Sequence, residues 1–303
     1  MKVLIAIDCS PASERVLDEA AARPWPEGTT FSVVNVVDVQ RFARFPVLIE
    51  DAKREADGLV KAGSEKLSRS EHQALSEVIM GFPRKAISEY AKEWHADLIM
   101  VGSHGHSAIG RFLLGSVAQG ILRTAPCSME IVRSASGGPV PSSHPMKILL
   151  ATDGSDCSVG AAHSVANRPW PDGTVIKVLS VEELIILDGQ IAGFPLSPVY
   201  PQSLLEELTT QARDRANSAA KTAREILQRA GMKVLDGKAT ELGEPRAVIL
   251  DAAKTWGSDL IVLGSHGRRG MDRFLMGSVS EAVAIHAHCS VEVVRSNAEC
   301  LRN

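Results

Sequence analysis

Residues 2–8 read KVLIAID and residues 147–153 read KILLATD, at an offset of 145 positions (147 minus 2). Each stretch is an apolar run that ends on aspartate, which is typical of a buried parallel strand with a polar group at its carboxyl end. The two copies stay in step, because residues 23–26 and residues 168–171 both read RPWP. A repeat of this kind within a chain of 303 residues predicts two copies of one domain.

The second copy carries a longer middle section than the first. Pro83 corresponds to Pro245 at an offset of 162 positions (245 minus 83), which exceeds the earlier offset by 17. The extra residues are expected between about 183 and 235. Within that range, residues 184–200 contain several Gly and Pro and form a long excursion, which suits a lid or a contact surface.

Short apolar runs alternate with helical patterns along each copy. In the first copy, strands are expected near residues 2–8, 30–37, 74–80, 97–101 and 128–133, with helices between them. In the second copy, Ser203 and Glu206 form a capping box before a helix of about seven turns that Gly231 ends. Such alternation predicts an α/β fold in which each copy is a parallel sheet with helices on both faces.

Composition and a linker set the expected domain boundaries. With 45% hydrophobic but only 4% aromatic residues, the cores should consist of Val, Ile, Leu and Ala. The stretch SASGGPVPSSHP at residues 134–145 is rich in Ser, Gly and Pro, as solvated linkers are. The predicted organisation is a first domain at 1–134, a linker at 135–145, a second domain at 146–296 and a tail at 297–303.

Charge and the amino terminus narrow the expected partners. The net charge of −3 and the pI near 6.3 supply no basic field for nucleic acid or an anionic membrane. Only five apolar residues precede Asp8, too few for a signal peptide or a membrane span, so a cytoplasmic protein is expected. The five cysteines have no C-x-x-C spacing and are expected to be reduced, with Cys127 and Cys289 buried in apolar runs.

A glycine motif follows the fourth apolar run of each copy. Gly102, Ser103, His104 and Gly105 precede nine residues and then Gly115 and Ser116; Gly264, Ser265, His266, Gly267, Gly277 and Ser278 repeat that spacing. Glycine lets a ligand approach the backbone, and a helix that begins at Gly-Ser presents free N–H groups, so the motif can bind phosphates. The chain has no Gly-Lys-Ser/Thr tripeptide and no G-x-G-x-x-G after its first strand, which argues against kinase, GTPase and dinucleotide-binding classes.

This spacing resembles the ATP-binding signature of the universal stress protein family. The strand ends Asp8 and Asp153, the Pro-Trp-Pro turns, and Cys-Ser-x-Glu-x-Val-Arg at residues 127–133 and 289–295 extend the resemblance over both copies. The resemblance implies two tandem five-stranded parallel sheets of the Rossmann-like, adenine nucleotide alpha hydrolase-like type. ATP would lie over the carboxyl ends of their strands, and the sequence leaves open whether Mg²⁺ accompanies it.

The resemblance also implies which residues contact the nucleotide. Asp8 and Asp153 would face the adenosine, while Val36 and Val181 would offer backbone groups to adenine. The residues expected around ribose and phosphates are Gly102, His104, Gly105, Gly115, Ser116 and Val117 in the first copy, and Gly154, Gly264, His266, Gly267, Gly277, Ser278, Val279 and Ser280 in the second. The second site is expected to be the tighter one, because Cys9 replaces a small residue and Ala118 stands where Ser280 would offer a hydroxyl to phosphate.

Other polar residues near the motifs have roles that the sequence leaves open. His104 and His266 invite a metal or acid–base role, but each copy lacks a second well-spaced ligand, so loop capping or phosphate contact is favoured and no metal site is expected. Arg111 and Arg273 could reach a phosphate or stay solvated. No paired acid, nucleophile and base surrounds the aspartates, so no catalytic residue is assigned.

These patterns lead to a prediction of function. The protein is expected to be an ATP-binding universal stress protein that regulates a stress response according to its nucleotide state, and at most a slow ATPase. In the resembling family such domains pair through their last strands, and the side chains of residues 128–133 and 290–295 alternate in polarity as those of pairing edge strands would. The sequence leaves open whether the protein forms a homodimer and whether it has a regulatory protein partner. The alternative is a structural or interaction module of the same fold that binds no nucleotide. A further alternative, an ATP-consuming transferase, would need a charged cluster that is absent from the sequence around the loops.

Overall fold

The structure is a computed structural model that describes residues 1–40, 42, 46–69, 72–104, 114–133, 145–182, 186–187, 190–191, 194–195, 202–268 and 276–295. The part up to Arg133 is referred to as the N-terminal half, and the part from Pro145 as the C-terminal half. The predicted linker falls almost wholly on residues 134–144 and the predicted tail on 297–303, both outside the described residues.

The N-terminal half alternates strands with helices, as its apolar runs predict. Its elements are β1 (Lys2–Ala6), α1 (Pro11–Ala22), β2 (Thr30–Val37), the 3-10 helix η1 (Pro46–Leu48), α2 (Ile49–Ser68), β3 (Gln73–Met80), α3 (Pro83–Glu93), β4 (Leu98–Gly102), α4 (Ser116–Thr124) and β5 (Ser128–Val132). The strands lie parallel in the order β3-β2-β1-β4-β5. All five predicted strands are confirmed, with ends shifted by at most two residues.

The C-terminal half repeats this order and adds to it. Its elements are β6 (Lys147–Ala151), α5 (Asp156–Ala166), β7 (Val175–Glu182), β8 (Ile186–Leu187), β9 (Gln190–Ile191), β10 (Phe194–Pro195), α6 (Gln202–Arg229), β11 (Thr240–Leu242), α7 (Pro245–Trp256), β12 (Leu260–Gly264), α8 (Ser278–His286) and β13 (Ser290–Val294). Strands β11, β7, β6, β12 and β13 lie parallel in that order. The three short strands β8, β9 and β10 fall within the predicted excursion and form a separate antiparallel sheet.

Two features of the C-terminal half differ from the expectation. Helix α6 begins at Gln202, so Ser203 lies within its first turn and the predicted capping box is wrong. Strand β11 pairs with β7 over only three residues, whereas β3 pairs with β2 over eight. The chain turns out of the ladder at Gly237, which has φ +119° and whose carbonyl oxygen accepts a hydrogen bond from Arg224 Nη2 at 2.7 Å.

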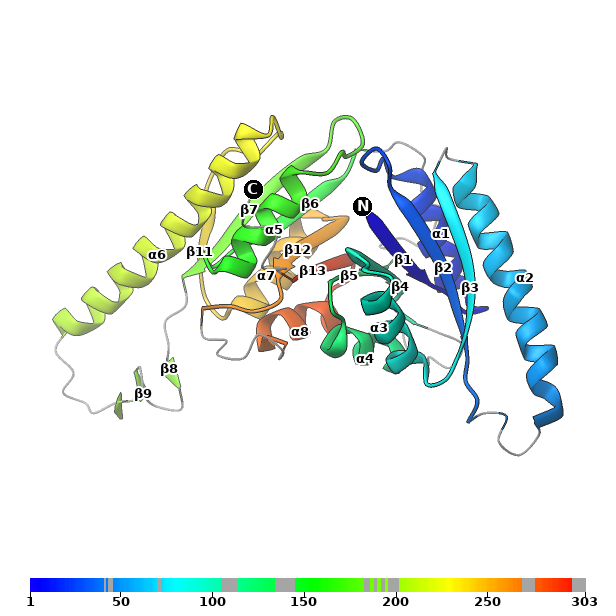
Figure 1. Cartoon of the computed structure of the whole chain (residues 1–303). Coiled ribbons are helices and arrows are strands. Elements are labelled where there is room, and N and C mark those ends of the chain that lie inside the picture. Colours follow the sequence, from blue (N-terminus) through cyan, green and yellow to red (C-terminus); the bar gives the residue numbers. More distant parts are fainter. Residues whose placement is uncertain are drawn as a thin grey trace.

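The two halves join through their last strands. Strands β5 and β13 pair antiparallel, with Ile131 opposite Val291 and Glu130 opposite Glu292, so the described strands of the two halves form one ten-stranded sheet. Figure 1 shows β5 and β13 at the middle of the molecule, with α2 and α6 at its outer flanks. The pairing agrees with the alternation expected of the two terminal strands.

The apolar core differs between the two faces of this sheet. On the face covered by α3, α4, α7 and α8, one continuous buried cluster runs through both halves and includes Ile99, Ile131, Val291 and Val283. On the opposite face there are two separate clusters, one under α1 and α2 and one under α5 and α6. The first face therefore holds the halves together by burial of shared apolar surface.

Buried charges occupy the junction on the second face. Glu130 and Glu292 are 0% and 1% exposed, and each accepts hydrogen bonds from the arginine of one RPWP motif, Arg23 and Arg168 respectively. Burial alone would lower the pKa of Arg23, but Glu130 and Glu19 raise it above its usual value. Arg23 also lies 5.4 Å from the ring centre of Trp170, so the motif of one half contacts the motif of the other.

Candidate functional site

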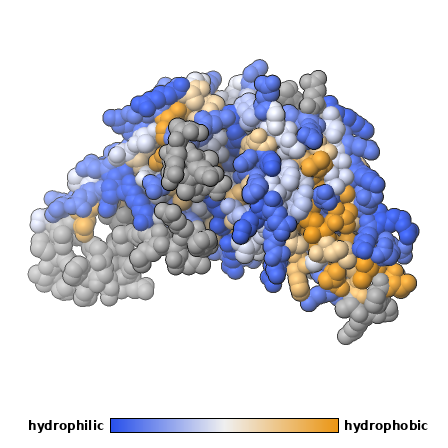
Figure 2. Space-filling model, in the orientation of Figure 1, coloured by the Kyte–Doolittle hydropathy of each residue, from blue (hydrophilic) through white to orange (hydrophobic). Residues whose placement is uncertain are grey.

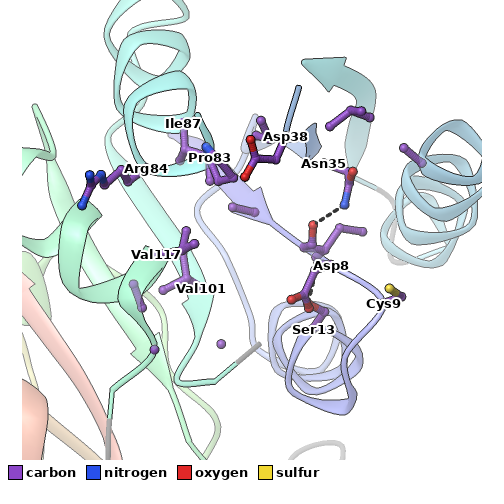
Figure 3. A pocket seen from close by; sticks show the side chains of 18 of the residues that line it. Asp8, Cys9, Ser13, Asn35, Asp38, Pro83, Arg84, Ile87, Val101 and Val117 are labelled. Carbon is purple, nitrogen blue, oxygen red and sulfur yellow. Dashed lines mark hydrogen bonds between the residues drawn. The ribbon is translucent and has the colours of Figure 1, made fainter. Parts of the chain in front are cut away.

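A cleft of about 1140 Å³ opens over the carboxyl ends of β1, β2 and β4 in the N-terminal half. Figure 3 shows that its walls come from the strand ends on one side and from α3 and α4 on the other. Seven residues predicted to bind the nucleotide line it: Asp8, Val36, Gly102, His104, Gly115, Ser116 and Val117. The eighth, Gly105, lies outside the described residues, as does Arg111.

Asp8 is held at the floor of this cleft by the turn that follows β1. Its Oδ1 accepts hydrogen bonds from the hydroxyls of Ser10 and Ser13, the latter at 2.8 Å, and from the backbone N–H of Ser10 at 3.0 Å. These bonds fix one side of the carboxylate group at the start of α1. Strand β2 continues to Val37, beyond its last pairing with β1 at Val34, which brings Val36 to the cleft wall.

The glycine motif closes a loop over the end of β4. The backbone N–H of Gly115 donates to the carbonyl oxygen of Ser103 at 2.8 Å, which brings the two ends of the nine-residue stretch together. Gly102 has a packing role as well, because a Cβ there would lie 2.7 Å from the Cβ of Ala12 in α1. The close approach of helix and strand therefore requires glycine at this position.

Helix α4 points its amino terminus at the cleft. Gly115 is its N-cap residue, and no side chain caps the free N–H groups of the first turn. Ser116 and Val117 are exposed at that end, whereas Ala118 is buried. A bare helix amino terminus beside a glycine loop is a favourable place for an anion, because its N–H groups and the helix dipole both attract negative charge.

The rest of the cleft is mostly apolar and was not predicted from the sequence. Phe82, Pro83 and Ile87 line it from the start of α3, and Phe42, Ala56 and Leu59 line it toward α2. Arg84 packs over Gly120 of α4, and Figure 3 shows its guanidinium directed away from the cleft centre. The repeated Pro-Arg at residues 83–84 and 245–246 was the available signal.

Apolar surface gathers beside this cleft. Phe82 is 46% exposed, Val47 81% and Leu48 45%, all near the ends of β3 and η1. Figure 2 shows apolar surface over this lower part of the N-terminal half, next to hydrophilic surface on α2. In the C-terminal half, Glu244 takes the position of Phe82 and caps α7 through the backbone N–H groups of Arg246 and Ala247.

The corresponding loops of the C-terminal half are in contact with one another. Asp153 Oδ1 accepts from the hydroxyl of Ser155 at 2.6 Å, and its Oδ2 accepts from the backbone N–H of Arg268 at 3.0 Å. Gly154 has φ +75°, and a Cβ there would lie 2.7 Å from a guanidinium nitrogen of Arg268. Asp153, Gly154 and Gly267 therefore meet where the loop after β12 crosses the end of β6.

Glycine is also required by packing in this half. A Cβ on Gly264 would lie 2.6 Å from the backbone carbon of Cys157, and one on Gly267 would lie 2.8 Å from Asp153 Oδ2. Gly277 begins α8 as its N-cap, and its N–H donates to the carbonyl of Ser265 at 2.9 Å, as in the other half. Ser278 and Val279 lie in the first turn of α8, and Val181 lies near the end of β7.

Ser280, which was predicted to offer its hydroxyl to phosphate, contacts the end of β12 in the structure. Its side chain is buried, and its hydroxyl donates to the carbonyl oxygen of Gly264 at 2.6 Å. The hydroxyl thus ties α8 to the end of β12. The reason given for a tighter second site is weakened by this contact, although the relative affinity of the two sites stays a prediction.

Both histidines of the motifs contact the neighbouring serine. His104 Nδ1 and His266 Nδ1 each lie 3.0 Å from the hydroxyl oxygen of the preceding serine, Ser103 or Ser265. Burial lowers the pKa of His266, and the nearby charge of Arg295 lowers it further, which favours the neutral imidazole. These contacts are consistent with loop capping, one of the two roles favoured from the sequence; phosphate contact stays a prediction.

Comparisons with known proteins agree on one family. The family model described as universal stress protein family matches residues 1–133 and 145–295. Universal stress protein Rv2005c of Mycobacterium tuberculosis is 26% identical over 311 residues, 97% of each chain. Universal stress protein MJ0531 of Methanocaldococcus jannaschii is 31% identical over 151 residues, which cover 49% of this chain and 81% of that relative.

Solved structures show the same fold over the whole length. The crystal structure of a universal stress protein from Archaeoglobus fulgidus has a TM-score of 0.65 at 19% identity and covers 98% of this chain and 97% of its own. A functionally unknown protein from Pseudomonas aeruginosa PAO1 has a TM-score of 0.60 at 15% identity, with 97% and 92% covered. Of the helices that the structure describes, none has both the length and the apolar character needed to cross a bilayer.

Proposed function

This chain belongs to the universal stress protein family, with the family's domain present twice in tandem, and we propose that it is an ATP-binding member that regulates a stress response according to its nucleotide state. The proposal includes action in the cytoplasm and a protein partner that responds to bound nucleotide. Hydrolysis of ATP would be slow at most.

The observation that carries the proposal is the cleft of about 1140 Å³ in the N-terminal half, with the uncapped amino terminus of α4 in its wall. Adenine would lie against Val36 and the apolar wall of α3, and the phosphates would accept hydrogen bonds from the first turn of α4. Each hydrogen bond to a charged phosphate oxygen contributes about 1.5–3 kcal/mol net, so a few of them suffice for micromolar affinity after the cost of ordering the ligand.

The polar groups of the cleft favour binding over efficient chemistry. Asp8 is engaged by two serine hydroxyls, which leaves it poorly placed to act as a general base. Among the described residues no group of three His, Cys, Asp or Glu side chains could hold a metal ion. Mg²⁺ would therefore arrive with the nucleotide and be held mainly by its phosphates.

A second candidate is a structural or interaction module that binds no nucleotide. Its support is that Gly102 and Gly264 are already required by the contacts of α1 and α5 with the sheet. In addition, Asp153 is covered by the backbone of Arg268. Glycines kept for packing would preserve the motif in a member that had lost its ligand.

The experiment that separates the two candidates begins with denaturing the purified protein and identifying released nucleotide by chromatography. ATP is then titrated into stripped wild type, Gly115→Asp and Gly277→Asp, with Gly58→Asp on the exposed side of α2 as the matched control. If the heat of ATP binding is lost mainly in Gly277→Asp, the C-terminal site is the tighter one, as the sequence predicts. If it is lost mainly in Gly115→Asp, the cleft in the N-terminal half is the tighter one. No released nucleotide and no heat with ATP would favour the interaction module.

A further inference from the structure

One arginine from each half of the molecule forms hydrogen bonds with a helix of the other half. Arg295 follows β13, and its Nη2 donates to the carbonyl oxygens of Leu122 and Arg123, at 3.0 and 3.3 Å, in the last turn of α4. Arg133 follows β5, and its Nη2 donates to the carbonyls of Ala284 and Ile285, at 2.6 and 3.2 Å, in the last turn of α8. Each half therefore caps the carboxyl terminus of the other half's site helix.

The capped helices are the ones that begin at the glycine motifs. Helix α4 runs for nine residues from Ser116, and α8 for nine from Ser278. A helix of that length spans about 13 Å. A shift of the capping arginine at one end would therefore be transmitted along one short helix to the free N–H groups at the other end, where the proposed nucleotide would bind.

The same arginines adjoin the glycine loop of their own half. The carbonyl of Val294, the residue before Arg295, accepts the N–H of Ser265 at 2.8 Å. The carbonyl of Val132, the residue before Arg133, accepts the N–H of Ser103 at 3.2 Å. The charge of Arg295 also reaches His266 of that loop, whose pKa it helps to lower.

Neither arginine has a carboxylate partner in the part of the chain that the structure describes. Burial lowers the pKa of Arg133 to about 10, which reflects a positive charge with little compensation. Burial also lowers the pKa of Arg295. Two cations without a carboxylate partner among the described residues therefore lie at the junction between the halves, where their charge would act on an anion bound in either half.

We propose that Arg133 and Arg295 are positioning residues that serve both nucleotide sites and couple them, so that a polyphosphate bound in one half weakens binding in the other. The inference rests on the proposed nucleotide binding. The first ligand uses the attraction of the shared cations, and the second ligand then gains less and is repelled by the first. Couplings between sites in proteins commonly correspond to changes in affinity of about five-fold or more.

The test uses the full chain and a non-hydrolysable ATP analogue. Amide NMR signals of Ser116 and Ser278 report the two sites separately. Gly277→Val is intended to block the second site without adding charge, because its side chain would crowd the glycine loop, with a Cβ 3.0 Å from the Ser265 carbonyl oxygen. We expect the N-terminal site to bind at least about five-fold more tightly in Gly277→Val than in wild type whose other site is filled. The reciprocal experiment with Gly115→Val should give the same factor.

The arginine variants identify the cause of the coupling. Replacement of both arginines by Met should reduce the factor to below about two, while replacement of both by Lys, which keeps the charge, should retain most of it. Arg224→Met is the matched control, because Arg224 also donates to main-chain carbonyls but lies away from the junction. A merely structural role would lower stability and leave the dependence between sites unchanged. If the double Met variant does not fold, the single variants Arg133→Met and Arg295→Met still test the role of the arginines, and the comparison of filled with blocked sites still tests the coupling itself.

Failure of the coupling and failure of the proposed function give different results. Equal affinity of each site whether the other is filled or blocked would overturn the coupling alone, and so would a site that stays empty even in the variant whose other site is blocked. An absence of signal shifts with any adenine nucleotide would overturn the proposed function as well.

Discussion

Gly102 and Gly264 combine two roles that a glycine motif by itself does not separate. Each glycine ends a strand where the following residues could cradle phosphates, and each also lies under the first turn of a helix. A Cβ would come within 2.7 Å of Ala12 in one half and 2.6 Å of Cys157 in the other. Both values are far shorter than ordinary carbon contacts of about 3.5–4.0 Å.

Substitution of one of these glycines should destabilise the fold regardless of ligand. We expect Gly264→Ala to lower the free energy of unfolding by about 1–3 kcal/mol, because a methyl group overpacks the contact between α5 and β12. Urea denaturation of nucleotide-free protein measures this. Gly58→Ala, on α2 with no atom within 4 Å of its added Cβ, is the matched control and should be neutral or stabilising by up to about 1 kcal/mol. Equal stability of Gly264→Ala and wild type would contradict the packing role.

The cysteines should differ sharply in reactivity. Burial raises the pKa of Cys127 and of Cys289 to about 12, whereas Cys9 is exposed in the cleft wall. At about pH 8 only about one in ten thousand of the buried thiols would be thiolate. We expect a thiol reagent to modify Cys9 in native protein and to reach the buried pair only after unfolding, as peptide mass spectrometry would record. Modification of Cys289 in native protein at the rate of Cys9 would contradict this.

Among the secondary-structure elements, the β5–β13 pair places two glutamates directly opposite each other. Like charges in that position repel, and burial increases the cost. Arg23 and Arg168, which follow α1 and α5, offset it by binding one carboxylate each. The two RPWP motifs, which the sequence marks only as turns, therefore supply the charge that offsets this repulsion. Trp25 and Trp170 also anchor these turns, because their indole N–H groups donate to the carbonyls of Ala20 and Val165.

Removal of one partner from this charge group should cost more than removal of a whole pair. We expect Arg168→Met to destabilise the chain by about 3–5 kcal/mol, because Glu292 is left buried without its cation. The double variant Arg168→Met with Glu292→Leu should recover part of that loss. Thermal denaturation compares them.

The control for this experiment is an exposed ion pair of the same chain. Lys53 and Glu50 lie on α2 with side chains 40% and 73% exposed, so Lys53→Met should cost less than about 1 kcal/mol. A double variant as unstable as Arg168→Met would mean that the orphaned carboxylate is not the source of the cost.

For the molecule as a whole, the shared core makes the two halves depend on each other. The cluster on the α3, α4, α7 and α8 face includes side chains from both halves, and Ile131 in it pairs with Val291 across the junction, while the cluster that contains Leu67 belongs to the N-terminal half. The side chains of Ile131 and Leu67 are fully buried. A smaller side chain in the shared cluster should therefore lower the stability of both halves.

Hydrogen exchange can test this dependence. Ile131→Ala and Leu67→Ala should each cost about 2–5 kcal/mol. We expect Ile131→Ala to reduce the protection of amides in both β1 and β6, and Leu67→Ala to reduce it mainly in β1. Protection that falls only in the N-terminal half with Ile131→Ala would mean that the halves unfold independently.

Much of this architecture could be predicted from the sequence because its signals are local. Strands such as Leu98–Gly102 stand out as apolar runs, and because residues 2–8 are repeated at 147–153, each pattern could be checked in a second copy. The start of α6 was misplaced by two residues and β11 was shorter than its counterpart, since helix ends and edge strands depend on a few weak contacts. In the candidate site, the glycine loops were predicted, but the apolar wall around Phe82 and Ile87 was not, because single apolar residues carry no local mark of a cleft.

The sequence by itself determined that this chain has two α/β copies, which family it belongs to, and where its glycine loops lie, because spacing and periodicity are readable along one dimension. Only the tertiary structure decided that Glu130 faces Glu292, that Ser280 bonds the Gly264 carbonyl, and that Arg133 and Arg295 cap helices of the opposite half. Each of the junction contacts joins residues more than 150 positions apart. Such contacts follow from the antiparallel register of two strands, which many sequences of the same pattern could satisfy in other ways.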